Sequence, residues 1–210
     1  MKAKNLHIGG CAVCILPVIK GLISESDKVE EAFATLHPDM LALSISKEEL
    51  DGLKNLPENF EPELSRYEEI YAKGLGRFGE VAAPPPCYVA ALELAEHDGI
   101  PTVAVDLDET SYTDLYCASV PGSTLFRHST RTWILKRRTF GANTPEDFVL
   151  AWDRTVNKLD GFDIVEEKRA DAIAAGIDAA SKKSRRLLAL VELERAGDVF
   201  SRLSRRSDLQ

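Results

Sequence analysis

The sequence predicts a single α/β domain whose central sheet, mostly parallel or mixed and built of short strands, carries helices on both faces. Three observations favour this class. Short apolar runs recur along the chain, amphipathic helical segments separate them, and the C-terminal half is rich in helical patterns. Strands that alternate with helices favour parallel pairing, because a helix in the connection covers one face of the sheet.

The chain opens with a predicted strand, helix and strand. Residues 5–10 form a short apolar stretch that ends in two glycines, as a buried strand entering a turn does. We expect residues 15–23 to form an apolar loop. A capping pattern at Asp27 then starts a helix that ends before Pro38. Residues 40–45 are predicted to be the second strand.

The middle of the chain contains three predicted helices and a third strand. Two charged helical stretches cover residues 47–56 and 61–73, and the second repeats apolar residues at helical spacing. The consecutive prolines at 84–86 favour an extended connector. A helix over residues 88–97 and a strand over residues 102–106 follow.

The C-terminal half is predicted to be mostly helical from Ser111 onward. Thr144 followed by Pro145 and two acids is a strong helix start, because threonine caps the first turn and proline fits its first position. Residues 162–177 carry another apolar stripe at helical spacing. Residues 187–191 form a late fourth strand.

Composition agrees with one globular unit, which we place at residues 1–203 with a polar tail at 204–210. The 210 residues include 44% hydrophobic and 29% charged side chains, close to globular averages. The net charge of -8 disfavours generic binding to nucleic acid or anionic lipid, since both are polyanions. The apolar run at residues 11–19 is too short to span a bilayer and lacks the flanks of a signal peptide, so we expect a cytoplasmic protein.

Four cysteines without a secretory signal are expected to be reduced thiols. Cys11 and Cys14 form a CxxC pair, but a four-sulfur zinc site needs a second close pair. Cys87 and Cys117 lie too far apart in sequence to be one. Free cysteine commonly packs as a small hydrophobe. We therefore predict buried structural cysteines and keep a metal or redox role as the alternative.

Several strings along the chain occur in the order and spacing of the landmarks of a known family. These strings lie at residues 8–14, 38–45, 90–95, 99–106, 168–174 and 188–195. Together they resemble the TraB family, which includes the Tiki proteases and is grouped with erythromycin-esterase-like and ChaN-like folds. The resemblance covers nearly the whole chain and implies an α/β fold.

The family carries a histidine, a glutamate and a second histidine at strand ends, where they are thought to hold a divalent metal that activates water. The resemblance places Ala12, Ser44 and Arg195 at these positions. Alanine cannot ligate, neutral serine is a poor ligand, and arginine brings a permanent cation to the place of the metal. The resemblance thus implies a disarmed site without a metal cofactor, in which these three side chains lie together.

Residues near the predicted strand ends are candidates for other sites. One alternative is a zinc or iron site made of thiolates and a carboxylate, namely Cys11, Cys14, Cys87 and Asp106. The basic stretch at residues 127–138 is expected to be a solvated helix face, with binding of an anionic ligand or acidic partner as the alternative. Ligands of open α/β sheets bind at strand ends. The ligand-binding candidates are Gly9, Gly10, Glu80, Asp106, Asp108 and Arg169.

Three functional hypotheses follow, in this order. The first is a non-catalytic binding or regulatory protein that retains a TraB-like scaffold for a small molecule, peptide or protein partner. The second is a metal-dependent hydrolase that uses the rebuilt cysteine and aspartate site. The third is an oligomeric interaction module that presents the helical residues 111–181 to a second copy.

Overall fold

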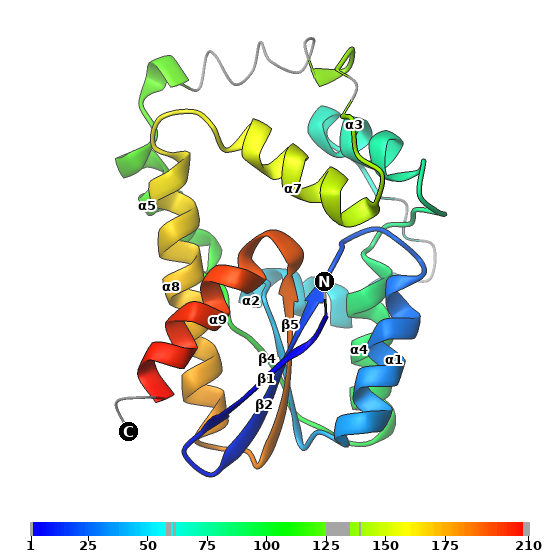
Figure 1. Cartoon of the computed structure of the whole chain (residues 1–210), viewed down its shortest axis with the longest axis vertical. Helices are drawn as coiled ribbons and strands as arrows, with labels where there is room; N and C mark the ends of the chain where they lie inside the picture. Colours follow the sequence, from blue (N-terminus) through cyan, green and yellow to red (C-terminus); the bar gives the residue numbers. More distant parts are fainter. Residues whose placement is uncertain (1, 58–59, 61, 125–134, 139, 208–210) are drawn as a thin grey trace.

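The structure is a computed structural model of the whole chain, and it describes residues 2–57, 60, 62–124, 135–138 and 140–207. These residues form a five-stranded sheet in the order β1-β2-β5-β3-β4, with helices on both faces (Figure 1). β1 pairs antiparallel with β2, whereas the remaining neighbours pair in parallel. The predicted α/β class, with its mostly parallel sheet and helix-rich C-terminal half, is confirmed.

The strands are short, and the middle one is the most deeply buried. They are β1 (Lys4–Ile8), β2 (Cys11–Val18), β3 (Met40–Leu43), β4 (Thr102–Ala104) and β5 (Arg186–Glu192). Every residue of β5 after Arg186 is buried. A strand covered on both faces needs such a continuous apolar run, which explains why β5 was visible in the sequence.

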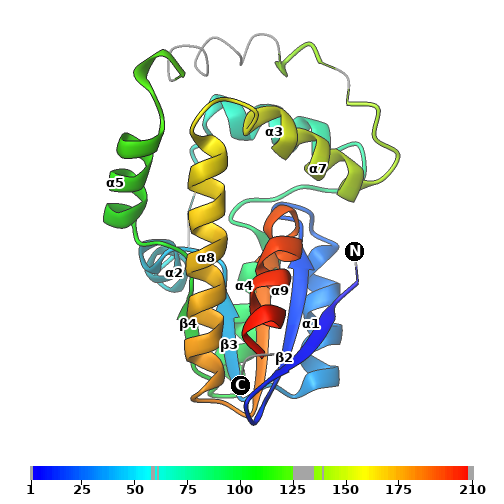
Figure 2. The same ribbon diagram turned by 60° about the vertical axis from the view of Figure 1, so that its left-hand side comes forward.

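Two pairs of helices cover the sheet. On one face lie α1 (Glu25–Leu36) and α4 (Pro86–His97), whose buried side chains share a cluster with Leu41 and Leu190. The other face is covered by α8 (Phe162–Ser181) and α9 (Leu193–Ser207) (Figure 2). The alternate residues of each strand therefore point into two separate apolar cores.

The remaining helices lie at the edges of this sandwich. They are α2 (Lys47–Lys54), α3 (Arg66–Leu75), α5 (Glu109–Ser119) and α7 (Pro145–Val156). Figures 1 and 2 show α3 and α7 crossing above the carboxyl ends of the central strands. A third apolar cluster fills the space beneath them, and it joins Ile19, Leu75, Phe148 and Leu193. This layer forms the roof of the site described below.

The helix starts follow the sequence only in part, since α3 begins at Arg66 and not at residue 61. Thr144 caps α7 as predicted, because its side chain accepts a hydrogen bond from the Asp147 N–H at 3.1 Å. The prediction that Asp27 caps the first helix is wrong, since α1 begins at Glu25 without a side-chain cap. The Glu25 carboxylate instead turns inward and accepts a hydrogen bond from the Ile19 N–H at 3.1 Å.

Two further elements differ from the sequence prediction. The prediction of a loop from residue 15 is wrong, because β2 continues through Pro17 to Val18. β1 pairs with β2 only as far as Ile15, so Pro17 lies where β5 is the sole neighbour and proline is tolerated. The helix α9 was not predicted and includes residue 203, the expected domain boundary.

Candidate functional site

A cleft of about 460 Å³ opens between the carboxyl ends of the central strands and the helices above them. Its walls are rich in aromatic side chains, and we call it the aromatic cleft. Small-molecule sites in proteins measure roughly 300–1,000 Å³, and in parallel sheets they lie at this edge. The aromatic cleft therefore has the size and place of a ligand site.

Aromatic rings from four helices line two sides of this cleft. On one side Trp152 of α7 contacts Tyr67 and Tyr71 of α3, with ring centroids 6.4 and 5.7 Å apart. On the other side Tyr112 and Tyr116 of α5 stack at 5.9 Å. Tyr116 also meets the ring of Phe162 of α8 edge-on at 5.8 Å, which completes that wall.

A chain of ion pairs with alternating sign runs along the base of the cleft. Its members, in spatial order, are Lys20, Glu192, Arg195, Glu166, Arg169 and Asp106. The Nε of Arg195 lies 2.7 Å from the Oε2 of Glu166. The Nε of Arg169 donates to the Oδ2 of Asp106 at 3.0 Å, and its guanidinium lies 5.6 Å from the centre of the Tyr112 ring.

The strand order brings these charges together. Lys20 follows β2, Glu192 ends β5 and Asp106 follows β4, and the carboxyl ends of parallel strands meet at one edge. Glu166 and Arg169 are three residues apart on α8 and therefore share one helix face. Residues from distant parts of the sequence thus form one network.

This network is mostly shielded from water. The side chains of Glu192 and Arg195 are 2% and 9% exposed, so neither charge would be tolerated without its partner. Burial alone would raise the pKa of Glu166, but the guanidinium groups of Arg195 and Arg169 hold it below its ordinary value. The paired charges fix one another's positions beneath the aromatic walls.

Two other carboxyl groups of the cleft have pKa values shifted upward. Burial raises the pKa of Glu194, and the nearby acids Asp153 and Glu166 add to the effect against the opposing field of Lys20. Burial and Glu166 likewise raise the pKa of Asp153. Perturbed titratable groups in a cleft are typical of functional sites. The surroundings of Glu194 and Asp153 therefore stabilise the ionised carboxylate less well than water does.

The structure separates Ala12 from the other two positions that the family resemblance placed with it. Arg195 reaches Ser44 through Glu192, whose backbone N–H donates to the Ser44 Oγ at 3.1 Å and whose carboxylate pairs with Arg195. Ala12 lies at the other end of the sheet, in register with Arg186 at the start of β5.

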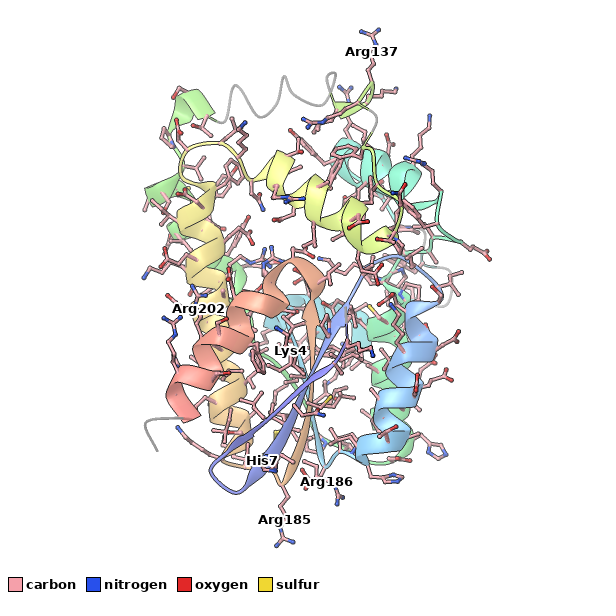
Figure 3. The ribbon with its side chains drawn as sticks, in the orientation of Figure 1. Lys4, His7, Arg137, Arg185, Arg186 and Arg202 are labelled. Carbon is pink, nitrogen blue, oxygen red and sulfur yellow. The ribbon has the colours of Figure 1, made fainter. Side chains whose placement is uncertain are left out.

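Figure 3 labels two neighbours of Ala12 on the adjacent strands. These neighbours, His7 and Arg186, are at the end of the molecule opposite to Arg137. Arg186 and Glu192 are the two ends of the seven-residue strand β5, and the six steps between them span roughly 20 Å. The expectation that Ala12 lies with Ser44 and Arg195 is wrong, because residues 9 and 10 form the turn before β2.

The other ligand-binding candidates divide between the two ends of the sheet. Asp106 and Arg169 pair with each other in the ion-pair chain. Gly9 and Gly10 form the hairpin turn at the opposite end. Asp108 is the N-cap of α5, and its hydrogen bonds to Ser111 lower its pKa. Glu80 is exposed, and its carbonyl accepts a hydrogen bond from the Ile23 N–H.

The cysteines of the alternative site do not come together. Cys11 packs into the core beneath α8 and α9, whereas Cys14 and Cys87 belong to the core on the other face of the sheet. Burial raises the pKa of the Cys14 thiol and raises that of Cys87 to about 12. A thiol in this state is a poor nucleophile and a poor metal ligand. Within the described part of the chain, no group of three or more His, Cys, Asp or Glu residues is arranged to hold a metal ion.

Sequence reasoning missed most residues of the aromatic cleft. Lys20 and Glu192 were not named as site candidates because the ends of β2 and β5 were misjudged, and Glu194 was not named because it lies in α9, which was not predicted. The buried spacing of Leu193, Ala196, Val199 and Leu203 would have revealed α9, and with it the place of Glu194. Residues 127–134 of the predicted basic stretch lie outside the described residues, whereas residues 135–138 are described.

No family model and no curated protein matches this chain. The resemblance to the TraB family therefore stays a prediction. Among the described helices, none is both long enough and apolar enough to cross a membrane.

Proposed function

We propose that this chain binds a small organic cation, of the class of protonated arylalkylamines, in the aromatic cleft and performs no covalent chemistry on it. The observation that carries the proposal is Glu194, a carboxyl group of the cleft whose pKa burial raises. A cation beside it would favour its ionised form. The faces of tyrosine and tryptophan rings attract cations as well. The aromatic walls of the cleft and the Glu194 carboxylate therefore both favour a positively charged ligand.

The charge balance of the cleft supports this choice of ligand. Its cations Lys20, Arg169 and Arg195 each form an ion pair with an acid of the chain. Among the described residues, the only cation within ion-pair distance of Glu194 is Arg195, at 3.5 Å. Arg195 already pairs with Glu166 and Glu192, so it is shared among three acids. A ligand with a positive charge would find an acid available, whereas an anion would not find a cation available.

We favour binding over catalysis because the reactive side chains are occupied or remote. The Lys20 ammonium pairs with Glu192, and this ion pair opposes release of the free amine even though burial lowers the pKa of Lys20. The buried thiols lie in the two cores of the sheet. The proposal agrees with the first hypothesis from the sequence, a non-catalytic binding protein. Unlike that hypothesis, it does not require Ala12 to lie in the site. The oligomeric module stays a prediction.

Titration calorimetry with phenethylamine tests the proposal, and 2-phenylethanol serves as the neutral analogue of the same shape. We expect the amine to bind and the alcohol to bind at least about tenfold more weakly. Glu194→Gln should weaken amine binding about tenfold, since it removes the charge and keeps the shape. Glu93→Gln, an exposed acid on α4, is the matched control and should have no effect. Equal binding of amine and alcohol would reject the proposal.

The pH dependence of the same titration gives a second test. A raised carboxyl pKa means that Glu194 takes up a proton at a higher pH than an ordinary glutamate. As the pH falls, the protonated carboxyl loses its attraction for the amine, whose own charge is unaffected in acid. Affinity should therefore decrease toward acid pH in the native chain. In Glu194→Gln the profile should be flatter, and an unchanged profile would remove Glu194 from the site.

A further inference from the structure

A second cleft of about 760 Å³ lies on the other side of α3 from the aromatic cleft. Tyr67 and Tyr71 of α3 line the aromatic cleft, whereas Lys73 and Gly74 of the same helix line this one. Phe140 and Phe148 contribute its apolar surface. The two clefts are thus separate cavities that share one helix as a wall.

The charges around this cleft are almost all positive. Its cations are Arg66, Lys73, Arg77, Lys136 and Arg138, and we call it the basic cleft. Glu69 is the one acid among the described residues that line it. Such a concentration of positive charge stands out in a chain whose net charge is -8.

The positive charges of the basic cleft are not neutralised by acids among the described residues. In the described part of the structure, none of them lies within ion-pair distance of an acid. Arg77 donates to the Phe140 carbonyl at 3.4 Å, and the Arg138 guanidinium lies 5.4 Å from the centre of the Phe140 ring. Like charges gathered around one cavity repel one another, and an anion between them would offset that repulsion. The cations of the aromatic cleft, by contrast, are all paired.

We propose that the basic cleft binds a small, multiply charged anion of the phosphate class. Guanidinium groups present parallel N–H donors that match phosphate oxygens, and Arg66, Arg77 and Arg138 offer three of them around one cavity. The cavity suits a small molecule in volume. The acidic character of the rest of the chain disfavours an extended nucleic acid, whose backbone would pass beyond the basic cleft.

Titration calorimetry of the full chain with sodium tripolyphosphate tests this proposal. We expect saturable binding that weakens as salt is added, because exposed charges are screened. The double variant Lys73→Gln with Arg77→Gln should weaken binding by about tenfold or more. The control Lys54→Gln with Lys183→Gln removes the same charge from exposed positions outside the cleft, and it should change affinity by no more than about twofold.

A second variant protects the test against a folding defect. Arg66→Gln with Lys136→Gln leaves the Arg77 hydrogen bond in place and should also weaken binding, while thermal unfolding confirms that each variant folds. Equal loss of binding in the Lys54 and Lys183 control would overturn the proposal, as would absence of tripolyphosphate binding. Citrate that binds as tightly would overturn the phosphate assignment, and so would a single-stranded oligonucleotide that binds more tightly than tripolyphosphate.

Discussion

Ser44 takes part in the hydrogen bonding that joins two strands to the ion-pair chain. It is fully buried, and its Oγ accepts the Glu192 N–H at 3.1 Å while lying 3.4 Å from the Tyr88 hydroxyl. A buried backbone N–H must find an acceptor, and at the end of β5 a side chain supplies it. A small polar residue at this position therefore sets the start of α9, which carries Glu194 and Arg195.

Replacement of Ser44 by alanine should lower the free energy of unfolding by about 1–3 kcal/mol, because the Glu192 N–H is left without its acceptor. Chemical denaturation measures the change. Ser201→Ala is the control, since Ser201 is exposed and its hydroxyl donates to the Gly197 carbonyl of its own helix. A Ser44→Ala variant as stable as the control would show that the hydroxyl is dispensable.

Glu166 and Glu194 line one cleft but should affect stability in opposite directions. The folded chain lowers the pKa of Glu166, so its ionised form stabilises the fold above the unfolded-state pKa, and this contribution is lost as pH falls through the folded-state pKa. Glu166→Gln should cost about 1–3 kcal/mol at neutral pH, less than for a fully buried pair because 24% of the side chain is exposed. The deficit should disappear in acid.

Glu194 shows the reverse linkage, since burial raises its pKa. Its ionised form opposes folding, and protonation removes that penalty as pH falls. Glu194→Gln should therefore unfold no more easily than the native chain at neutral pH, within about 0.5 kcal/mol, or be more stable. Denaturation midpoints of both glutamine variants across pH measure the contrast, and parallel losses of stability would contradict it.

At the scale of elements, the packing of α3 against α7 defines both clefts. Phe148 of α7 lies against Gly74, and a Cβ at that glycine would overlap its ring. Phe148 also contacts Tyr71 and Phe140, with ring centroids 5.7 and 5.4 Å away. Close approach of the two helices at Gly74 brings Phe148, which lines the basic cleft, into contact with Tyr71, which lines the aromatic cleft.

Gly74→Ala should destabilise the chain by about 1–3 kcal/mol through overpacking, even though alanine is the better helix former. Gly52→Ala in α2 is the matched control, because a Cβ there meets nothing within 4 Å. The control should gain about 0.5–1 kcal/mol from helix propensity. Thermal or chemical unfolding measures both, and a stabilised Gly74→Ala variant would mean that the helices separate without cost.

The sequence predicted those elements whose signals are local. Thr144 with Pro145 marks a helix start by itself, and the buried run of β5 marks a central strand. Pro17 concealed the end of β2, because its tolerance depends on where β1 stops pairing. The cleft depends on the strand order, which local patterns do not encode. Asp106 and Arg169 were named as candidates, but not as partners 63 residues apart.

At the scale of the whole molecule, stability should be highest at the middle of the sheet. β5 pairs on both sides, with β2 and β3, and both its faces are covered. α5 contributes no buried residue, so its local opening exposes little apolar surface. These two elements should therefore mark the extremes of protection from solvent.

Hydrogen exchange of backbone amides should show this difference directly. We expect the amides of β5 to exchange at least about 100-fold more slowly than those of α5, because opening β5 requires disruption of the sheet. Phenethylamine should slow exchange in α5, whose Tyr112 and Tyr116 line the aromatic cleft. Similar rates in β5 and α5 would contradict this gradient of local stability.

The shared wall formed by α3 has a thermodynamic consequence. A helix shifts as a rigid body, so an occupant that displaces α3 from one side also alters the opposite rim. Any resulting cooperativity must be reciprocal: the factor by which tripolyphosphate changes the affinity for an amine equals the factor by which the amine changes the affinity for tripolyphosphate. In a molecule with two independent pockets, neither ligand would change the dissociation constant of the other. Here α3 lines both clefts, so a displacement of this helix by one ligand would change the affinity for the other.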